Sequence, residues 1–515
     1  MKGDFALSEA MDFGILSIIP PLVAIILALV TKEVIPSLLL GIITGGLIFT
    51  GFNVLQTVET VFTLMGTQMS DNSLMLLFLG LLGALVTVIN KAGGSFAYGK
   101  WAGEKIKSPS MAKLSAAILG IMIFIDDYFN CLTVGAVMKP ITDKNNVPRA
   151  KLAYIIDSTA APICIIAPVS SWAASIVSNI DSANVDNAMG VFISTIPFNL
   201  YALLTIICVF IFAFVNFDIG PMAEFDLNDT SIETSDLSSE YELVHSEKGK
   251  VVDLILPVLI LIIVTVYFML RTGGLFSGDV STLGEAFGNA NTNISLVIGS
   301  FAGLVMAFVM YIPRKLMTLS EFMNGINEGV KSMIGAMIIL ILAWTIGGIT
   351  QTDYLNTGGY VANQLTNASI PIWIFPAIIF ILSSLLSFST GTAWGTFGIL
   401  IPIIVPIIVH MGAMSHISVI LASIFSGSVF GDHCSPISDT TILSSAGANC
   451  HHIDHVRSQM PYSIIVAISS IIGFIFGSYF NNPVIAISTA LISLIIVIII
   501  AKHLTEAKLR KKGLI

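Results

Sequence analysis

The chain has 515 residues, of which 55% are hydrophobic and only 11% are charged. Soluble domains carry about 25% charged residues, so this composition excludes an ordinary soluble protein and indicates one embedded in a membrane. The formal net charge of −9 is unlike that of a nucleic-acid-binding protein, and the sequence contains no phosphate-binding glycine loop of the kind that ATP-driven pumps use.

Apolar segments that can enter a bilayer follow one another along the whole chain. They are residues 13–31, 34–51, 73–90, 114–138, 151–180, 188–217, 251–270, 292–311, 332–349, 370–409, 414–445, 459–480 and 484–501. Two of them do not read as simple spans. Residues 114–138 are divided at Asp126 and Asp127 into pieces of about 12 and 11 residues, each too short to cross a bilayer. Residues 370–409 turn polar in the middle, at 387–394.

Basic residues indicate how these two segments enter the membrane. Lysines lie on both sides of segment 114–138, and cytoplasmic loops carry an excess of Lys and Arg. We therefore predict a re-entrant hairpin that enters and leaves on the cytoplasmic side, with its tip near Asp127. Segment 370–409 has no Lys or Arg in either flank, and we predict a second hairpin that enters from outside. With both hairpins, all of the 23 Lys and Arg residues except Lys2 and Arg271 fall on the cytoplasmic side.

This arrangement predicts an internal repeat. Residues 13–217 and 251–480 each give five spans and one re-entrant hairpin, in opposite orientations. An acidic cytoplasmic linker, 218–250, joins the two repeats, 484–501 is an extra C-terminal transmembrane helix, and 502–515 is a basic cytoplasmic tail. The loops 52–72 and 350–369 then lie outside. The predicted fold class is an all-α polytopic membrane protein, an inverted repeat with broken helices, which is the architecture of secondary transporters.

Polar residues, Gly and Pro interrupt the apolar segments at four places, 126–133, 157–168, 387–396 and 431–441. A helix broken inside a membrane frees backbone groups, so such a break persists only where it is buried in protein or lines a wet cavity. A carboxylate at the bilayer centre costs about 2.5–3.5 kcal/mol and marks a functional site. The predicted ion- and proton-coupling residues are Asp126, Asp127, Asp157, Asp432 and Asp439. The predicted neutral partners, which bind ions or substrate, are Asn130, Thr133, Ser158, Thr159, Ser389, Thr390, Thr392, Ser438, Thr440 and Thr441.

These residue types suit a hard cation, which prefers carboxylate, hydroxyl and carbonyl oxygen. Burial raises the pKa of a carboxyl group and a bound cation lowers it, so one carboxylate holds either Na⁺ or a proton. That competition is sufficient for Na⁺/H⁺ exchange. An aspartate at a helix end is also a common N-cap, which is the alternative for Asp126 or Asp439 taken singly.

Histidines and cysteines near residues 433–455 suggest a second alternative, a bound metal. Their spacing matches no zinc pattern, and we expect residues 446–458 at the cytoplasmic rim, where polar side chains cost little. We therefore predict no metal beyond Na⁺. The residues concerned are His433, Cys434, Cys450, His451, His452 and His455.

Two long stretches carry recognisable motifs. Residues 124–174 read FIDDYFNCLTVGAVMKPITDKNNVPRAKLAYIIDSTAAPICIIAPVSSWAA, and residues 430–462 read FGDHCSPISDTTILSSAGANCHHIDHVRSQMPY. Both resemble the NhaC-type Na⁺/H⁺ antiporter family of the ion-transporter superfamily. The resemblance implies a bacterial inner-membrane protein whose transport domain moves like an elevator against a dimeric scaffold. It also implies functional diversity, because some relatives exchange Na⁺ and H⁺ while others exchange organic acids such as malate and lactate, or move amino acids.

We therefore expect a secondary active transporter, and no enzyme, that exchanges Na⁺ and H⁺ by alternating access. The expected partners are these two coupling ions and the lipid bilayer, with no cofactor and no nucleic acid. We expect a homodimer in the inner membrane with a cytoplasmic C-terminus. The alternative is a Na⁺- or H⁺-coupled transporter of a small organic acid or amino acid. A passive channel and an intramembrane enzyme are less favoured, because inverted repeats with broken helices favour alternating access.

Overall fold

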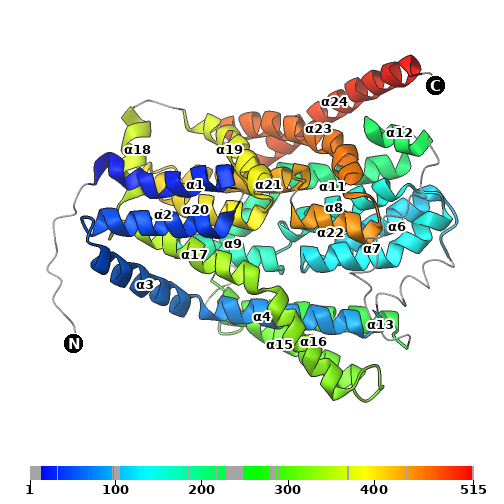
Figure 1. Ribbon diagram of the computed structural model, residues 1–515, viewed down its shortest axis with the longest axis horizontal. Coiled ribbons are helices and arrows are strands. Elements are labelled where there is room, and N and C mark those ends of the chain that lie inside the picture. Colours follow the sequence, from blue (N-terminus) through cyan, green and yellow to red (C-terminus); the bar gives the residue numbers. More distant parts are fainter. Residues whose placement is uncertain are drawn as a thin grey trace.

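The computed structural model describes residues 13–31, 33–94, 97, 105–183, 185–215, 217–227, 248–278, 280, 286, 289–367, 371–436 and 438–512. Within these ranges every regular element is a helix, and no β-strand occurs. Eight helices are long and apolar enough to cross a membrane, or nine if one bent pair counts as a single span. Most helices lie side by side along the longest axis of the molecule (Figure 1). The predicted class of an all-α polytopic membrane protein is confirmed.

The first helices partly follow the predicted spans. They are η1 (Gly14–Ile18), α1 (Ile19–Thr31), α2 (Val34–Phe49), α3 (Val54–Asp71) and α4 (Ser73–Lys91). Helix α3 occupies most of the segment 52–72 that we predicted as a loop. It is amphipathic, with Thr57, Val61 and Leu64 buried at helical spacing, and its polar residues keep it below the hydropathy of a spanning segment.

The segment predicted as the first hairpin forms two packed helices, α6 (Pro109–Met122) and α7 (Asp127–Lys144), with residues 123–126 between them. The side chain of Asn130 stabilises this break. Its Nδ2 atom donates to the carbonyl oxygens of Gly120 at 2.7 Å, Ile123 at 3.0 Å and Thr159 at 2.9 Å. The free carbonyls at the end of α6 are therefore satisfied inside the protein, as a membrane requires.

The second predicted hairpin consists of α19 (Phe375–Thr390) and α20 (Ala393–His410), which also contact each other. Gly391 ends α19 in the left-handed region at φ +69°, where a residue without Cβ has no steric cost. Thr392 then starts α20, because its hydroxyl accepts a hydrogen bond from the Gly395 N–H.

Two further helices are broken, the second within the predicted stretch 431–441 and the first later than most of the predicted stretch 157–168. Helix α8 (Arg149–Cys164) is followed by α9 (Ser171–Ser182), and α21 (Ile417–Cys434) is followed by α22 (Asp439–Ala448). Asp157 therefore lies inside α8, and Asp432 lies in the last turn of α21. The prediction at 157–168 placed the first break too early because Pro162 is accommodated within α8. A proline removes only its own N–H from the helix, so it does not always end one.

The remaining helices complete two halves of similar order. The first half continues with α10 (Ala188–Thr195), η2 (Ile196–Phe198) and α11 (Leu200–Phe214), and short α12 (Pro221–Leu227) lies in the predicted linker, of which residues 228–247 are outside the described ranges. The second half adds α13 (Val251–Thr272), α15 (Thr292–Tyr311), α16 (Leu319–Ser332), α17 (Ile334–Thr350), α18 (Thr357–Asn367) and α23 (His452–Tyr479), and the chain ends with α24 (Pro483–Lys511).

Helices at matching positions in the two halves make matching contacts. Helix α1 packs against α2 as α13 packs against α15, and α6 contacts α8 as α19 contacts α21. Across the halves, α3 lies against α17 and α4 against α16, while α7 contacts α22 and α20 contacts α9. Several contacts of the helices in the first half therefore have counterparts in the second.

Candidate functional site

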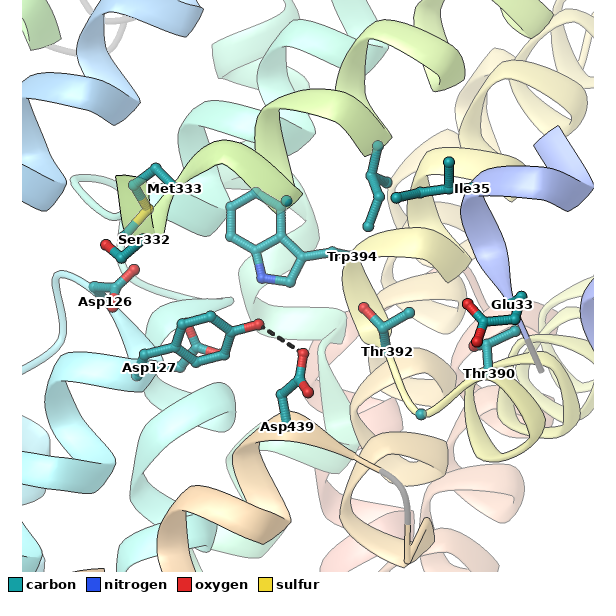
Figure 2. A pocket seen from close by; sticks show the side chains of 14 residues that line it. Glu33, Ile35, Asp126, Asp127, Ser332, Met333, Thr390, Thr392, Trp394 and Asp439 are labelled. Atoms are coloured by element: carbon teal, nitrogen blue, oxygen red, sulfur yellow. Dashed lines mark hydrogen bonds between the residues drawn. The ribbon is translucent and has the colours of Figure 1, made fainter. Parts of the chain in front are cut away.

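Both hairpin tips and one broken helix meet at a polar cavity of about 330 Å³. Figure 2 shows Asp127, Asp439, Thr392 and Trp394 around it. The structure thus brings together five predicted site residues from three distant segments. The lining consists of Asp126, Asp127 and Tyr128 from the first tip, Thr390, Gly391, Thr392 and Trp394 from the second, Asp439 from α22, and Glu33, Ile35, Ser332, Met333, Gly335 and Ile339 from the ends of α1–α2 and α16–α17.

Among the residues that the structure describes, the lining of this cavity includes four carboxylates and no Lys, Arg or His. Asp127 is 1% exposed, and its Oδ2 atom has no hydrogen-bond partner among the described residues. Ser171 donates to Asp126 Oδ2 at 3.1 Å, and the Tyr128 hydroxyl donates to Asp439 Oδ2 at 3.1 Å. A cavity with this charge attracts cations and repels anions.

Beside the α21–α22 break, the carboxylate of Asp432 is surrounded by hydroxyl groups. Asp432 is buried, its Oδ1 accepts from Ser438 at 2.9 Å, and its Oδ2 accepts from Thr440 at 2.6 Å. The two hydroxyls also contact each other at 2.9 Å. Ser438 caps α22, so the adjacent Asp439 is not the cap and its carboxylate is available to the cavity. Hydroxyl groups can rotate to present lone pairs, so this shell suits a hard cation.

Asp157 is fully buried and has a different set of neighbours. Its Oδ2 accepts from Gln459 Nε2 at 2.5 Å and from the Thr441 hydroxyl at 3.3 Å, and His455 Nε2 lies 3.4 Å from the same atom. The Thr441 hydroxyl also lies 3.3 Å from the Asp432 carbonyl oxygen. Thr441 therefore links the two carboxylate-bearing helices.

His433, His455 and Gln459 are residues around Asp157 that sequence reasoning missed. We expected residues 446–458 at a polar rim, but the side chain of His455 is fully buried, as is that of His433, whose Nε2 lies 4.0 Å from Asp157 Oδ1. His455 and Gln459 are four residues apart and so share one face of α23, and this spacing was the available signal.

Several predicted neutral residues do not line the cavity. The amide of Asn130 bonds backbone carbonyls, Thr133 donates to Asn90 Oδ1 at 3.1 Å, and Thr159 donates to the Ile155 carbonyl of its own helix at 2.7 Å. Ser158 is buried with no hydrogen-bond partner for its hydroxyl in the described part of the chain. The side chain of Ser389 lies outside what the structure describes.

Comparison with known proteins identifies the kind of protein. A model of the Na⁺/H⁺ antiporter family matches residues 163–478. The chain is 39% identical to an uncharacterized protein of Haemophilus influenzae, covering 97% of this chain and 98% of that one. It is 26% identical to the malate-2H⁺/Na⁺-lactate antiporter of Bacillus subtilis, over 36% of this chain and 43% of that one.

Solved structures of similar fold include that of another transporter. The YdaH transporter of Alcanivorax borkumensis superposes with a TM-score of 0.53 at 13% sequence identity, covering 83% of this chain and 90% of that one. The family model covers well over half of the sequence, including residues 430–462, and the resemblance to this family is thereby confirmed. The chain belongs to the Na⁺/H⁺ antiporter family, a family of secondary transporters.

Proposed function

We propose that this secondary transporter exchanges Na⁺ for H⁺ across the bacterial inner membrane by alternating access. The observation that carries this proposal is the cavity between the two hairpin tips. In the described part of the chain it has four carboxylates, no basic lining residue and a buried oxygen on Asp127 without a hydrogen-bond partner. A buried carboxylate pays a large desolvation cost unless a cation or a proton neutralises it. Na⁺ and H⁺ then compete for the same oxygens, and this competition couples their movements.

The ion site in this proposal extends from the cavity to Asp432. Asp432 with the hydroxyls of Ser438 and Thr440 provides a shell of oxygen ligands. Asp157 instead accepts a hydrogen bond from the Gln459 amide and lies near ring nitrogens of His433 and His455. An N–H group repels a cation, so Asp432 is the better Na⁺ ligand of the two. Asp157 holds the surrounding helices in place and keeps a negative charge close to the site.

The proposed mechanism moves the site as one unit, like an elevator, within an inverted repeat. Matching helix order in 13–217 and 251–480, and the matching contacts of the two halves, support an inverted repeat with two re-entrant hairpins. The distribution of basic residues supports a cytoplasmic linker at 218–250 and a cytoplasmic C-terminus. A homodimer would supply the fixed scaffold.

A second candidate function is the coupled transport of a small organic acid or amino acid, which the similarity to a malate and lactate antiporter favours. The second tip contributes Thr390, Gly391 and Thr392 to the cavity without a charge, and such groups suit an anionic or zwitterionic solute. No described Lys or Arg lines the cavity to clamp a dicarboxylate. An organic co-substrate should therefore carry at most one net negative charge.

Reconstitution separates the two functions. Proteoliposomes with defined Na⁺ and pH gradients should show Na⁺-driven proton movement without any organic solute. If exchange instead requires a monocarboxylate or amino acid, the coupled-carrier function replaces the plain antiporter. In that case Thr390→Val with Thr392→Val should weaken solute binding more than Na⁺ binding. Absence of both activities would refute the proposal, and saturable dicarboxylate uptake would refute the charge argument.

A further inference from the structure

A second polar cavity, of about 320 Å³, lies where three helices end. It is lined by Leu64, Gln68, Asp71 and Asn72 at the end of α3, by Asp181 and Ser182 at the end of α9, and by Gly348, Gln351, Thr352, Asp353 and Tyr354 at and after the end of α17. Helix α17 contacts both α3 and α9, and the three run close together in Figure 1. We call this space the acidic cavity.

The acidic cavity is strongly selective for positive charge. Its lining contains Asp71, Asp181 and Asp353, all exposed, and no Lys, Arg or His. Each of the three helices also ends here, and a helix C-terminus carries a partial negative charge. Carboxylates and helix ends together raise the local concentration of cations and exclude anions.

Helix α9 connects the acidic cavity with the ion cavity by one continuous polar face. At helical spacing, the positions that share the side of Ser171 are those four, seven, eight and eleven residues later, and all of them hold polar residues. The five residues are Ser171, Ser175, Ser178, Asn179 and Ser182. At 1.5 Å per residue, this face is about 16 Å long.

Both ends of this face are tied to the two cavities by hydrogen bonds. At one end the Ser171 hydroxyl donates to Asp126 Oδ2, which lines the ion cavity. Near the other end Ser178 donates to Asn72 Oδ1 at 2.7 Å, and Asn72 and Ser182 line the acidic cavity. The polar face of α9 therefore begins at one cavity and reaches the other.

Two oxygens in the middle of this face lack partners. Ser175 Oγ and Asn179 Oδ1 are fully buried and make no hydrogen bond among the described residues. A buried unsatisfied polar group costs about 1–3 kcal/mol, a cost that alanine at the same position would avoid. A serine in a helix can also bond its own preceding turn, and Ser175 does not. Such oxygens are suited to bind a passing cation or the water that accompanies it.

We propose that the acidic cavity is the outer entrance for the transported cation, and that the polar face of α9 is its route to the ion cavity. This proposal rests on the proposed cation exchange and on the orientation that the basic residues favour. That orientation places the ends of α3, α9 and α17 outside. It places the turns around Glu33 and Ser332, which line the ion cavity, toward the cytoplasm. The two cavities thus lie toward opposite sides of the membrane, and the buried face of α9 between them keeps the route closed in this structure, as alternating access requires.

Silver ions test the route, because Ag⁺ is a monovalent cation close to Na⁺ in size and reacts with thiols. Ser175→Cys and Asn179→Cys are placed singly in a background without the five native cysteines. Modification is measured as the loss of maleimide labelling after denaturation, so no transport is required. The control is Val177→Cys, since Val177 is equally buried on the same helix but lies on another face.

The expected result is that Ag⁺ added to the outside of right-side-out vesicles modifies positions 175 and 179 at least about tenfold faster than position 177, because thiol modification follows access to the sulfur. Excess external Na⁺ should slow the reaction at 175 and 179. Equal rates at all three positions would overturn the route. Absence of Na⁺/H⁺ exchange in wild-type proteoliposomes would instead refute the proposed function, whatever the labelling.

Removing the three negative charges of the acidic cavity tests whether they attract the external cation. The triple variant Asp71→Asn, Asp181→Asn and Asp353→Asn should raise the KM for external Na⁺ about tenfold at low ionic strength, with unchanged maximal rate, and the difference should vanish at high choline chloride. Asp186→Asn is the control, because Asp186 is also exposed near the end of α9 but does not line the acidic cavity. A triple variant with the wild-type KM at low ionic strength would show that this cavity is not the entrance.

Discussion

Replacing Asp432 by Asn should remove most of the affinity for Na⁺ while leaving the fold intact. The amide has the shape of the carboxylate, and the hydroxyls of Ser438 and Thr440 can rotate to pair with its oxygen and nitrogen. The substitution therefore removes a charge without leaving a cavity. It tests the electrostatic contribution of this side chain alone.

The magnitude follows from burial. Asp432 is 3% exposed, so little water screens its charge. A monovalent cation about 4 Å from a carboxylate gains about 4 kcal/mol at an effective dielectric constant of 20. Because 1.4 kcal/mol is tenfold, the dissociation constant for Na⁺ should rise by a factor of about 10²–10³.

The assay is equilibrium binding of radioactive Na⁺ to purified protein at fixed pH, with thermal unfolding measured on the same samples. The control is Asp143→Asn. Asp143 is an aspartate of α7 whose side chain is exposed and pairs with Arg149 at 3.3 Å. Asp143→Asn should leave Na⁺ binding unchanged. An Asp432→Asn protein that binds Na⁺ within about threefold of wild type would refute the reasoning, since that difference corresponds to less than 1 kcal/mol.

Three other predictions concern packing, pH and orientation. A Cβ atom on Gly447 would lie 2.7 Å from the Cys131 carbonyl oxygen. Gly447→Ala should therefore cost about 1–3 kcal/mol of overpacking and lower the melting temperature by several degrees. Gly66→Ala is the control and should not lower it, because a Cβ atom there would have nothing within 4 Å. The Lys512 ammonium, 2.7 Å from the Glu224 carboxylate, lowers the pKa of Glu224 from its ordinary value of 4.5. The stability from this ion pair is therefore fully present above pH 4.5 and is lost as the pH falls through the lowered pKa of Glu224. Glu224→Gln should therefore speed hydrogen exchange at the end of α24 at pH 7 and change the melting temperature by no more than about a degree or two, as an exposed pair contributes at most about 1 kcal/mol. Lys144→Cys should resist an impermeant maleimide on whole cells, and external labelling there would contradict the first hairpin.

The sequence was most informative where a local rule was broken. Aspartates at 126 and 127 and the Gly391–Thr392 pair interrupt long apolar runs, and the structure has its hairpin breaks at these places. The sequence was misleading where a proline lay inside an intact helix, as Pro162 does, and where an amphipathic helix such as α3 had too little apolar character to count as a span. Local patterns report propensity, and tertiary packing decides between the outcomes they permit.

Contacts between distant segments could not be predicted at all. Asp157 was selected as an intramembrane carboxylate, but nothing in its neighbourhood in sequence indicates that Gln459, 302 positions away, donates to it. The same holds for the Tyr128–Asp439 hydrogen bond, which joins the two halves. The chemistry of single residues was therefore predictable, whereas their pairing required the fold.

The three hydrogen bonds of Asn130 have a consequence for the energetics of exchange. They tie the end of α6, the start of α7 and the middle of α8 to one side chain, and so fix Asp127 and Asp157 on one rigid body. A carrier whose ligands keep their spacing throughout the cycle has the same intrinsic affinity on both faces of the membrane. Under the proposed exchange, such a carrier would bind Na⁺ equally well from either side, so its affinity would favour neither direction of transport.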